Sequence, residues 1–150
     1  MSPNSNLSGH EFFIGQSKRT NVEGIRFLSR TFPNYRVTPI YIESFSSAVL
    51  HLKSACSMCG PDHIIVGGEL GKLIANVVEC ASPHKYRITQ VVDSEAANCI
   101  FVNNVLIRRT REEFPESADD LDALGGNQIL IRVSELSKVD GALTCCSVLF

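Results

Sequence analysis

Two segments that are far apart in the sequence carry the residue types that nucleophilic catalysis requires. In one, Asp140 and Gly141 lead through small residues to the adjacent cysteines Cys145 and Cys146. The other holds His51 between two leucines. A cysteine nucleophile needs a base that is near in space, not in sequence. We therefore expect Cys145 to attack an electrophilic carbon, and His51 to protonate the leaving group and then activate water.

Each of these residues also has a plainer interpretation. Cysteine is among the most buried residue types and is usually inert, so Cys145 could belong to the core. His51, flanked by leucines, could be a hydrogen-bonded strand residue. Arg19 precedes an expected helix, where it could grip a substrate carboxylate through two parallel hydrogen bonds or simply be solvated. Spacing alone leaves these alternatives open.

A Cys-x-x-Cys motif at Cys56 and Cys59 offers a different chemistry, because this spacing occurs in zinc sites and in thiol–disulfide exchange. A structural zinc site usually has a second ligand pair. Cys145-Cys146 would be a poor one, because adjacent side chains on a strand point to opposite faces. A thioredoxin-type motif begins a helix, whereas Gly60-Pro61 follows here. We therefore expect no metal and no cofactor.

Composition narrows the class of protein and of partner. A chain of 150 residues with 44% hydrophobic and 20% charged residues fits one globular α/β domain. Its net charge of −2 provides no drive toward nucleic acid or anionic membranes. The basic cluster at residues 108–111 runs directly into Glu112-Glu113, which cancels most of its field. No apolar run approaches the roughly 20 residues that cross a bilayer.

The polar first seven residues lack the hydrophobic stretch of a secretory signal. We expect residues 1–7 to form a disordered leader and residues 8–150 to form a single domain. These features predict a cytoplasmic protein whose six cysteines are reduced thiols.

The segments that must position the candidate residues repeat one order of elements. Strands are expected at residues 11–15, 36–42, 50–54, 64–68, 86–92, 98–102, 105–107, 128–133 and 143–149, and helices at about 22–32, 69–80 and 115–124. The first helix follows a capping box at residues 20–23, and Pro115 and Gly125 delimit the third. A strand–strand–helix–strand unit thus recurs every roughly 40 to 50 residues, which indicates a repeat architecture. Nearly three units are present, and the first lacks an opening strand.

Five blocks of sequence occur in an order that is more specific than any one of them. They are EFFIGQSKRTN at residues 11–21, HLKS at 51–54, ANCI at 97–100, PESA at 115–118 and KVDGALTCCSVL at 138–149. Together they resemble the C-terminal half of the dimethylarginine dimethylaminohydrolases (dimethylargininases) of the pentein superfamily, from about Ser8 to Phe150. The resemblance implies a partial pentein β/α propeller, with about three strand–strand–helix–strand modules of the usual five.

The resemblance also implies residue roles and a reaction. Cys145 matches the nucleophile, His51 the general acid/base, Arg19 the residue that grips the substrate's α-carboxylate, and Asp140 an acid near the guanidinium. The substrate would be N-methylated arginine, such as asymmetric dimethylarginine, hydrolysed to citrulline and dimethylamine through a covalent thiouronium adduct and without a metal. Because methylated arginines inhibit nitric oxide synthase, this hydrolysis would relieve that inhibition.

One departure from the family pattern leaves an alternative open. Family members bind and orient the guanidinium with carboxylates in an N-terminal half that this sequence lacks. A guanidinium is a delocalised cation and a poor electrophile, so positioned carboxylates matter. The alternative is a truncated, catalytically silent interaction module. Three modules of a five-module ring would leave two open faces, which predicts self-association or a partner chain.

Overall fold

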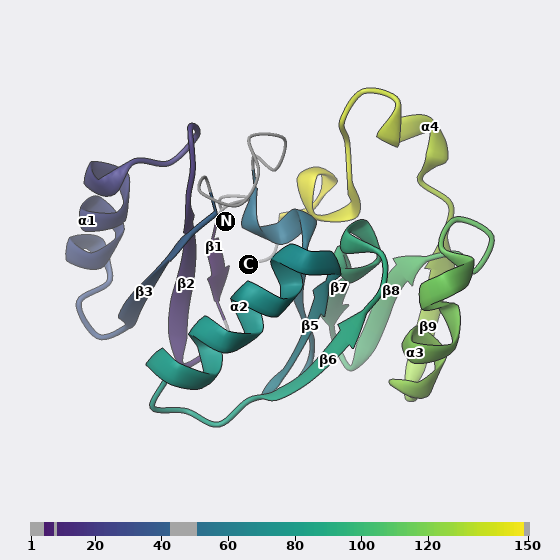
Figure 1. Cartoon of the computed structure of the whole chain (residues 1–150), viewed down its shortest axis with the longest axis horizontal. Helices are drawn as coiled ribbons and strands as arrows, with labels where there is room; N and C mark the ends of the chain where they lie inside the picture. Colours follow the sequence, from purple (N-terminus) through teal and green to yellow (C-terminus); the bar gives the residue numbers. More distant parts are fainter. Residues whose placement is uncertain (1–4, 8, 43–50, 149–150) are drawn as a thin grey trace.

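The computed structural model describes residues 5–7, 9–42 and 51–148, and Figure 1 shows three small sheets side by side. Module 1 contains β1 (Ser5–Leu7), β2 (Glu11–Gln16), α1 (Val22–Thr31) and β3 (Arg36–Tyr41). Module 2 contains β4 (Cys56–Gly60), β5 (His63–Gly67), α2 (Gly68–Ala81) and β6 (Arg87–Val91). Module 3 contains β7 (Ile100–Val102), β8 (Val105–Arg109), α3 (Ala118–Ala123) and β9 (Asn127–Ile131).

The three modules share one topology. In each, the first two strands form an antiparallel pair, and the helix carries the chain over to a third strand parallel to the second. Short helical segments connect the modules, namely η1 (Leu52–Ser54) and η2 (Ser94–Ala97), and two more follow module 3, namely α4 (Ser134–Ser137) and η4 (Leu143–Cys146). Within module 3, η3 (Pro115–Ser117) leads into α3. The predicted strand–strand–helix–strand repeat is therefore present three times, in three separate sheets that are not closed on one another.

Module 1 has an opening strand, so the prediction that it lacks one is wrong. Residues Ser5–Leu7 pair antiparallel with β2, and Ser5 lies opposite Ile14. Pairing along a free strand edge uses main-chain groups, which even a polar segment supplies. This strand also differs from the expectation of a disordered leader over residues 1–7, of which 1–4 lie outside the described ranges.

Two other predicted strands are helical turns. Of the strand expected at residues 50–54, residue 50 lies outside the described ranges, His51 is extended and the rest is the turn η1. The first strand of module 2 is instead β4. The strand expected at 143–149 begins with η4, while residue 149 lies outside the described ranges. In both places apolar residues are buried by a turn: the side chain of Leu52 is inaccessible, and that of Leu143 is 8% exposed.

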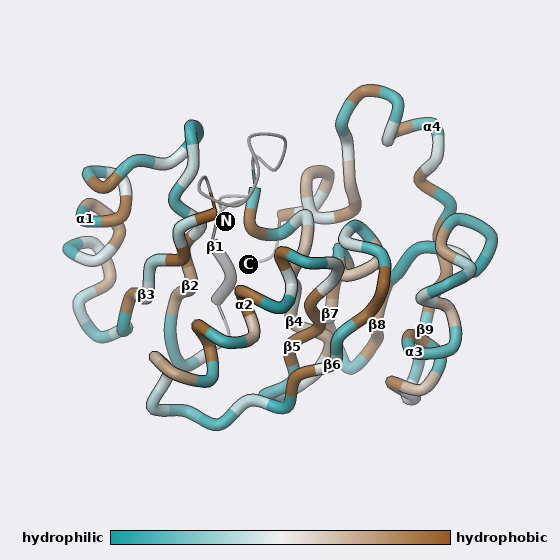
Figure 2. The backbone as a smooth tube through the Cα atoms, in the orientation of Figure 1, coloured by the Kyte–Doolittle hydropathy of each residue, from teal (hydrophilic) through white to brown (hydrophobic). Residues whose placement is uncertain are grey.

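The central strand β5 lies between two hydrophobic cores, and all five of its residues are buried. Ile64 and Val66 pack into the core shared with module 1, which also contains Phe13 and Ile40. Ile65 points to the other side, into the core shared with module 3. Because side chains alternate along a strand, a continuous apolar run serves both cores at once. Figure 2 shows this strand as one of the most hydrophobic segments.

The arginine cluster of β8 is neutralised within module 3. Arg108 is 1% exposed; it donates from Nε to Gln128 and forms an ion pair with Asp122. Arg109 forms ion pairs with Glu113 at 2.9 Å and Glu95 at 3.1 Å. These ion pairs offset the positive charge of the cluster, as its neighbouring glutamates predicted. Within the described ranges, no helix is both long enough and apolar enough to span a bilayer.

Candidate active site

Arg19 lies in a tight turn at the carboxyl end of β2. Ser17 and Thr20 exchange two backbone hydrogen bonds of 3.1 Å, and the Arg19 amide donates to the Ser17 hydroxyl at 3.1 Å. Helix α1 then begins with Asn21, whose side chain accepts from the Gly24 amide at 3.0 Å, so the cap falls one residue later than predicted. The turn leaves the Arg19 side chain exposed, where it can meet a ligand.

His51 lies between modules 1 and 2, half-buried, directly before the turn η1. Its carbonyl accepts from the Ser54 amide at 3.1 Å. Burial, followed by the positive charge of Arg19, lowers the pKa of His51 below its usual value. The imidazole is therefore neutral at neutral pH, the form that can accept a proton. The electrostatic interaction also shows that the structure brings His51 and Arg19 into one neighbourhood.

Cys145 is exposed in η4, and its amide donates to the Ala142 carbonyl at 3.1 Å. The preceding Asp140-Gly141 pair makes the turn. Asp140 has a φ of +58°, and a Cβ on Gly141 would lie 2.5 Å from Cγ of Leu136. Only glycine fits this approach. Asp140 is exposed at the same turn, and its role as an acid that binds the substrate guanidinium stays a prediction.

Asn98 joins the histidine segment to the cysteine segment. Its Nδ2 donates to the Lys53 carbonyl at 2.6 Å and to the Thr144 hydroxyl at 2.8 Å, and its Oδ1 accepts from the Thr144 amide at 3.2 Å. The side chain is buried, with the residue only 2% exposed. One amide thus holds two segments that carry His51 and Cys145, which spacing alone did not reveal.

Lys53 is a further residue that the sequence analysis did not single out. Burial lowers its pKa, while the charges of Cys56 and then Cys145 act in the opposite direction. The Lys53 ammonium and the Cys145 sulfur are therefore close enough to interact. The HLKS block contained this signal, because lysine lies two residues after the candidate histidine.

The Cys-x-x-Cys motif is part of the core. Cys56 packs into the core of modules 1 and 2, whereas Cys59 packs into that of modules 2 and 3. Their side chains thus serve different faces of β4 and do not form a ligand pair. Burial raises the pKa of Cys59 to about 12, which keeps this thiol protonated. Exposed cysteines in the described ranges are Cys80, Cys145 and Cys146.

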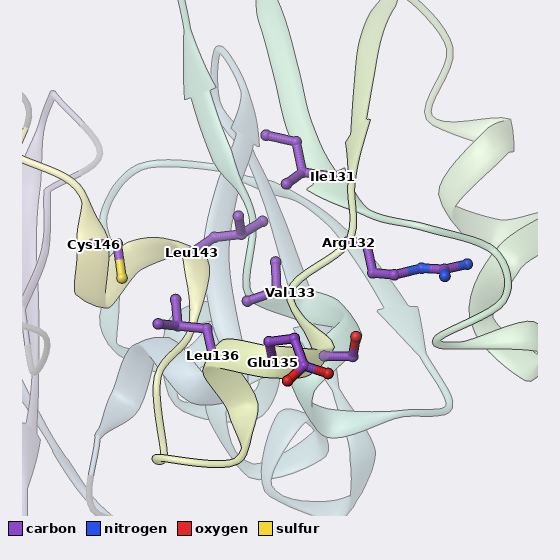
Figure 3. Close-up of a pocket in the computed structure, with 8 residues that line it drawn as sticks. Ile131, Arg132, Val133, Glu135, Leu136, Leu143 and Cys146 are labelled. Atoms are coloured by element: carbon purple, nitrogen blue, oxygen red, sulfur yellow. The ribbon is translucent and has the colours of Figure 1, made fainter.

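An apolar hollow lies beside the cysteine turn (Figure 3). Ile131, Val133, Leu136 and Leu143 contribute apolar side chains, and Cys146 lies at its border. The side chain of Arg132 extends away from this apolar group in the view of Figure 3. The hollow is therefore better suited to a hydrophobic neighbour than to a charged amino acid.

Comparisons with known proteins agree with the resemblance. No family model matches the chain. The N(G),N(G)-dimethylarginine dimethylaminohydrolase of Pseudomonas aeruginosa is 28% identical over 146 residues, which cover 96% of this chain and 53% of that protein. A solved structure of the Pseudomonas aeruginosa enzyme, a mutant in complex with citrulline, matches 99% of this chain and 55% of its own, with a TM-score of 0.74 and 26% identity.

The fold is shared more widely than the sequence. An amidinotransferase of saxitoxin biosynthesis from Microseira wollei matches 97% of this chain and 46% of its own, with a TM-score of 0.75 at 20% identity. The prediction of an α/β fold like that of dimethylargininases is thereby confirmed. The chain spans about half the length of the curated relatives it matches.

Proposed function

We propose that this chain carries the nucleophile of a dimethylargininase-type hydrolase acting on N-methylated arginine. The observation that carries the proposal is the arrangement around Asn98, which ties the segment of an exposed cysteine to that of a neutral histidine. Similarity in sequence to dimethylarginine dimethylaminohydrolases, over more than nine-tenths of the chain, supports the substrate class.

The neutral state of His51 sets the order of proton transfers. Because burial and Arg19 lower the pKa of His51, the imidazole first accepts the proton of the Cys145 thiol. The thiolate attacks the guanidinium carbon, and the bond to the methylated nitrogen breaks as that nitrogen takes the proton from His51. Dimethylamine leaves, and a thiouronium adduct on Cys145 remains.

Water completes the cycle. His51 takes a proton from a water molecule, whose oxygen attacks the thiouronium carbon, and the carbon–sulfur bond breaks. Citrulline leaves, the Cys145 thiol is restored, and the released proton ends on the dimethylamine. No step needs a metal or a cofactor. Removal of methylated arginine would relieve inhibition of nitric oxide synthase.

Two charged side chains would orient the substrate in this proposal. Exposed Arg19 would hold the α-carboxylate in a bidentate pair, at the turn beside His51. Asp140, exposed on the turn before Cys145, would face the guanidinium cation. A carboxylate placed there holds the carbon in line with the sulfur and stabilises developing charge.

We also propose that the three modules form a partial pentein propeller, with about three of the usual five modules, whose open faces bind another polypeptide. The edge strand of module 3 supports this proposal, because three consecutive apolar residues of β9, Ile129, Leu130 and Ile131, are 50%, 44% and 40% exposed. Such a patch suits a polypeptide neighbour. We expect a second copy of this chain to cover it. Sedimentation velocity should show a dimer that Leu130→Lys converts to monomer; a wild-type monomer would favour a separate partner chain.

Selective alkylation tests the proposed pocket. An amidine-bearing electrophile should modify Cys145 faster than Cys146 and Cys80, which are also exposed and serve as internal controls. Asymmetric dimethylarginine should protect Cys145 alone. Peptide mass spectrometry measures all three rates in one sample. Equal rates at the three thiols, with no protection, would contradict a guanidinium-binding pocket at Cys145.

A further inference from the structure

A second polar cluster lies at the opposite end of the strands from Cys145. Nε2 of His10 and Nε2 of His84 lie 2.8 Å and 2.9 Å from the same atom, Oδ1 of Asp62. The two imidazole rings stack, with centroids 3.8 Å apart and planes 22° apart. Three potential ligand atoms thus converge, all within 4.8 Å of one another.

The cluster joins segments that are distant in sequence. His10 precedes β2, Asp62 lies in the β4–β5 turn with a φ of +52°, and His84 lies in the loop after α2. The start of β2 and the loop after α2 follow the lower edge of Figure 1, whereas η4 and the β2–α1 turn lie in its upper part. The cluster therefore connects module 1 to module 2, away from the proposed active site.

Hydrogen bonds hold the segments that carry His10 and His84 in place. Buried Glu11, the residue after His10, accepts from the Ser82 and Tyr86 hydroxyls. Ser82 in turn accepts from the His84 amide at 3.0 Å. These contacts hold the main chain of His10 and His84 at the junction, so their rings approach Asp62 from a positioned backbone. Such support is what a metal site needs beyond its ligands.

The donor set suits a first-row transition metal. Two imidazole nitrogens and a carboxylate oxygen are ligands of zinc sites, with bonds of about 2.0 to 2.2 Å. Tetrahedral coordination at these lengths separates ligand atoms by about 3.3 Å, so each nitrogen would move roughly 0.5 Å from Asp62. Side-chain exposures of 47% for His10, 29% for His84 and 50% for Asp62 leave a route for an ion and water.

We propose that His10, Asp62 and His84 form a divalent-metal site, with zinc as the preferred ion, that fastens module 1 to module 2. The metal replaces the protons through which the two imidazoles bond to Asp62, and water supplies the remaining ligand. Binding needs the lone pair of a neutral imidazole, so protons compete with the metal for these ligands.

Titration with Zn²⁺ and with Co²⁺ tests the proposal. The titrations use a Cys80→Ser, Cys145→Ser, Cys146→Ser background, because exposed thiols would bind the same ions. One equivalent of Zn²⁺ should bind, Co²⁺ should give visible absorption that Zn²⁺ abolishes, and the melting temperature should rise with Zn²⁺. His10→Ala and His84→Ala should each weaken binding at least tenfold, measured by calorimetry.

Matched controls separate this site from the active site. His51→Ala, at the other end, should leave Zn²⁺ affinity unchanged. Asp62→Asn retains the size and exposure of the residue, so its weaker binding would report the lost charge rather than misfolding, which circular dichroism checks. Zn²⁺ binding that is equal in the parent, His10→Ala and His84→Ala would overturn the proposal, as would no binding by the parent. Because activity is never read, failure of the proposed hydrolase function would not affect this result.

Discussion

The two ends of the strands hold their polar groups in different ways. At the lower end, His10 and His84 already contact Asp62 directly. At the upper end, the proposed reactive groups are joined through other atoms: Asn98 binds Lys53 and Thr144, the neighbours of His51 and Cys145. The lower end is thus closed by side-chain contacts, whereas the upper end fixes the main chain and leaves the Cys145 side chain exposed.

Replacing one histidine at each end should give the largest difference in activity between the two ends. His51→Ala should lower citrulline formation from asymmetric dimethylarginine by about 10²- to 10⁴-fold, because general acid/base transfer is lost. His84→Ala should leave the rate unchanged. Steady-state assays of the two purified variants give the answer. Similar losses in both variants would show that the two ends are not functionally distinct.

Asn98→Ala should have the next largest effect. It removes three hydrogen bonds from a buried side chain and leaves the Thr144 amide without this partner. We expect unfolding to become easier by about 1–3 kcal/mol. Activity should fall by roughly 10-fold or more, because the cysteine segment is no longer held against the histidine segment.

Thr144→Val is the matched control for Asn98. It removes only the hydroxyl that accepts from Asn98, and keeps the backbone bond from the Thr144 amide. Its loss in urea-unfolding free energy and in activity should be clearly smaller than that of Asn98→Ala. An equal loss in both variants would mean that Asn98 does not act as the link.

Arg19→Met should weaken substrate binding and raise the pKa of His51. KM should rise with a smaller change in kcat, because a carboxylate contact is lost. The pKa of His51 should rise, because the charge of Arg19 no longer opposes protonation, and NMR titration measures this. The pKa of His63, lowered by burial and then by Arg87, is the internal control and should not move. If the pKa values of His51 and His63 both changed, or if neither changed, Arg19 would not be a specific neighbour of His51.

The smallest effect is expected at Asp62 in metal-free protein. Hydrogen bonding from His10, foremost, lowers the pKa of this exposed carboxyl. Its stabilising contribution is present above the ordinary aspartate pKa and is lost as the pH falls through the lowered pKa. Solvent screens the interaction, so Asp62→Asn should lower the melting temperature at pH 7 by only about 1–2 °C. A decrease in melting temperature above roughly 5 °C would show that the contacts of Asp62 with His10 and His84 strongly stabilise the junction of modules 1 and 2 without a metal.

The spacing of apolar residues predicted most of the helices and strands, because in each module these residues are buried on the inner faces of its elements. Helix α2 and strand β5 follow from apolar spacing, and Pro115 marks the start of the short segment η3, which leads into α3 at Ala118. The strands expected around His51 and Cys145 are turns instead, because short apolar runs have the same composition in either state. Asn98 holds both turns through hydrogen bonds to Lys53 and Thr144. These partners are 45 and 46 residues away in the sequence, so local spacing carries no sign of the contacts.

The candidate site was predictable in residue types but not in its supports. Cys145, His51 and Arg19 were indicated by chemistry and by the resemblance. Asn98 gave no local signal that distinguishes a supporting amide from a solvated one, and the signal for Lys53 was only its position two residues after His51. The cluster of His10, Asp62 and His84 could not be predicted from the sequence either. These residues have no spacing typical of metal ligands and meet only when modules 1 and 2 pack together.

Citrulline formation from asymmetric dimethylarginine, by the purified chain and by its Cys145→Ala variant, tests the central claim most directly. Truncation of an exposed side chain should leave the fold intact, which circular dichroism verifies. We predict measurable turnover by the chain and none by the variant. Turnover that persists in Cys145→Ala would contradict the nucleophile assignment, and a folded chain without turnover would contradict the prediction that this chain catalyses the reaction by itself.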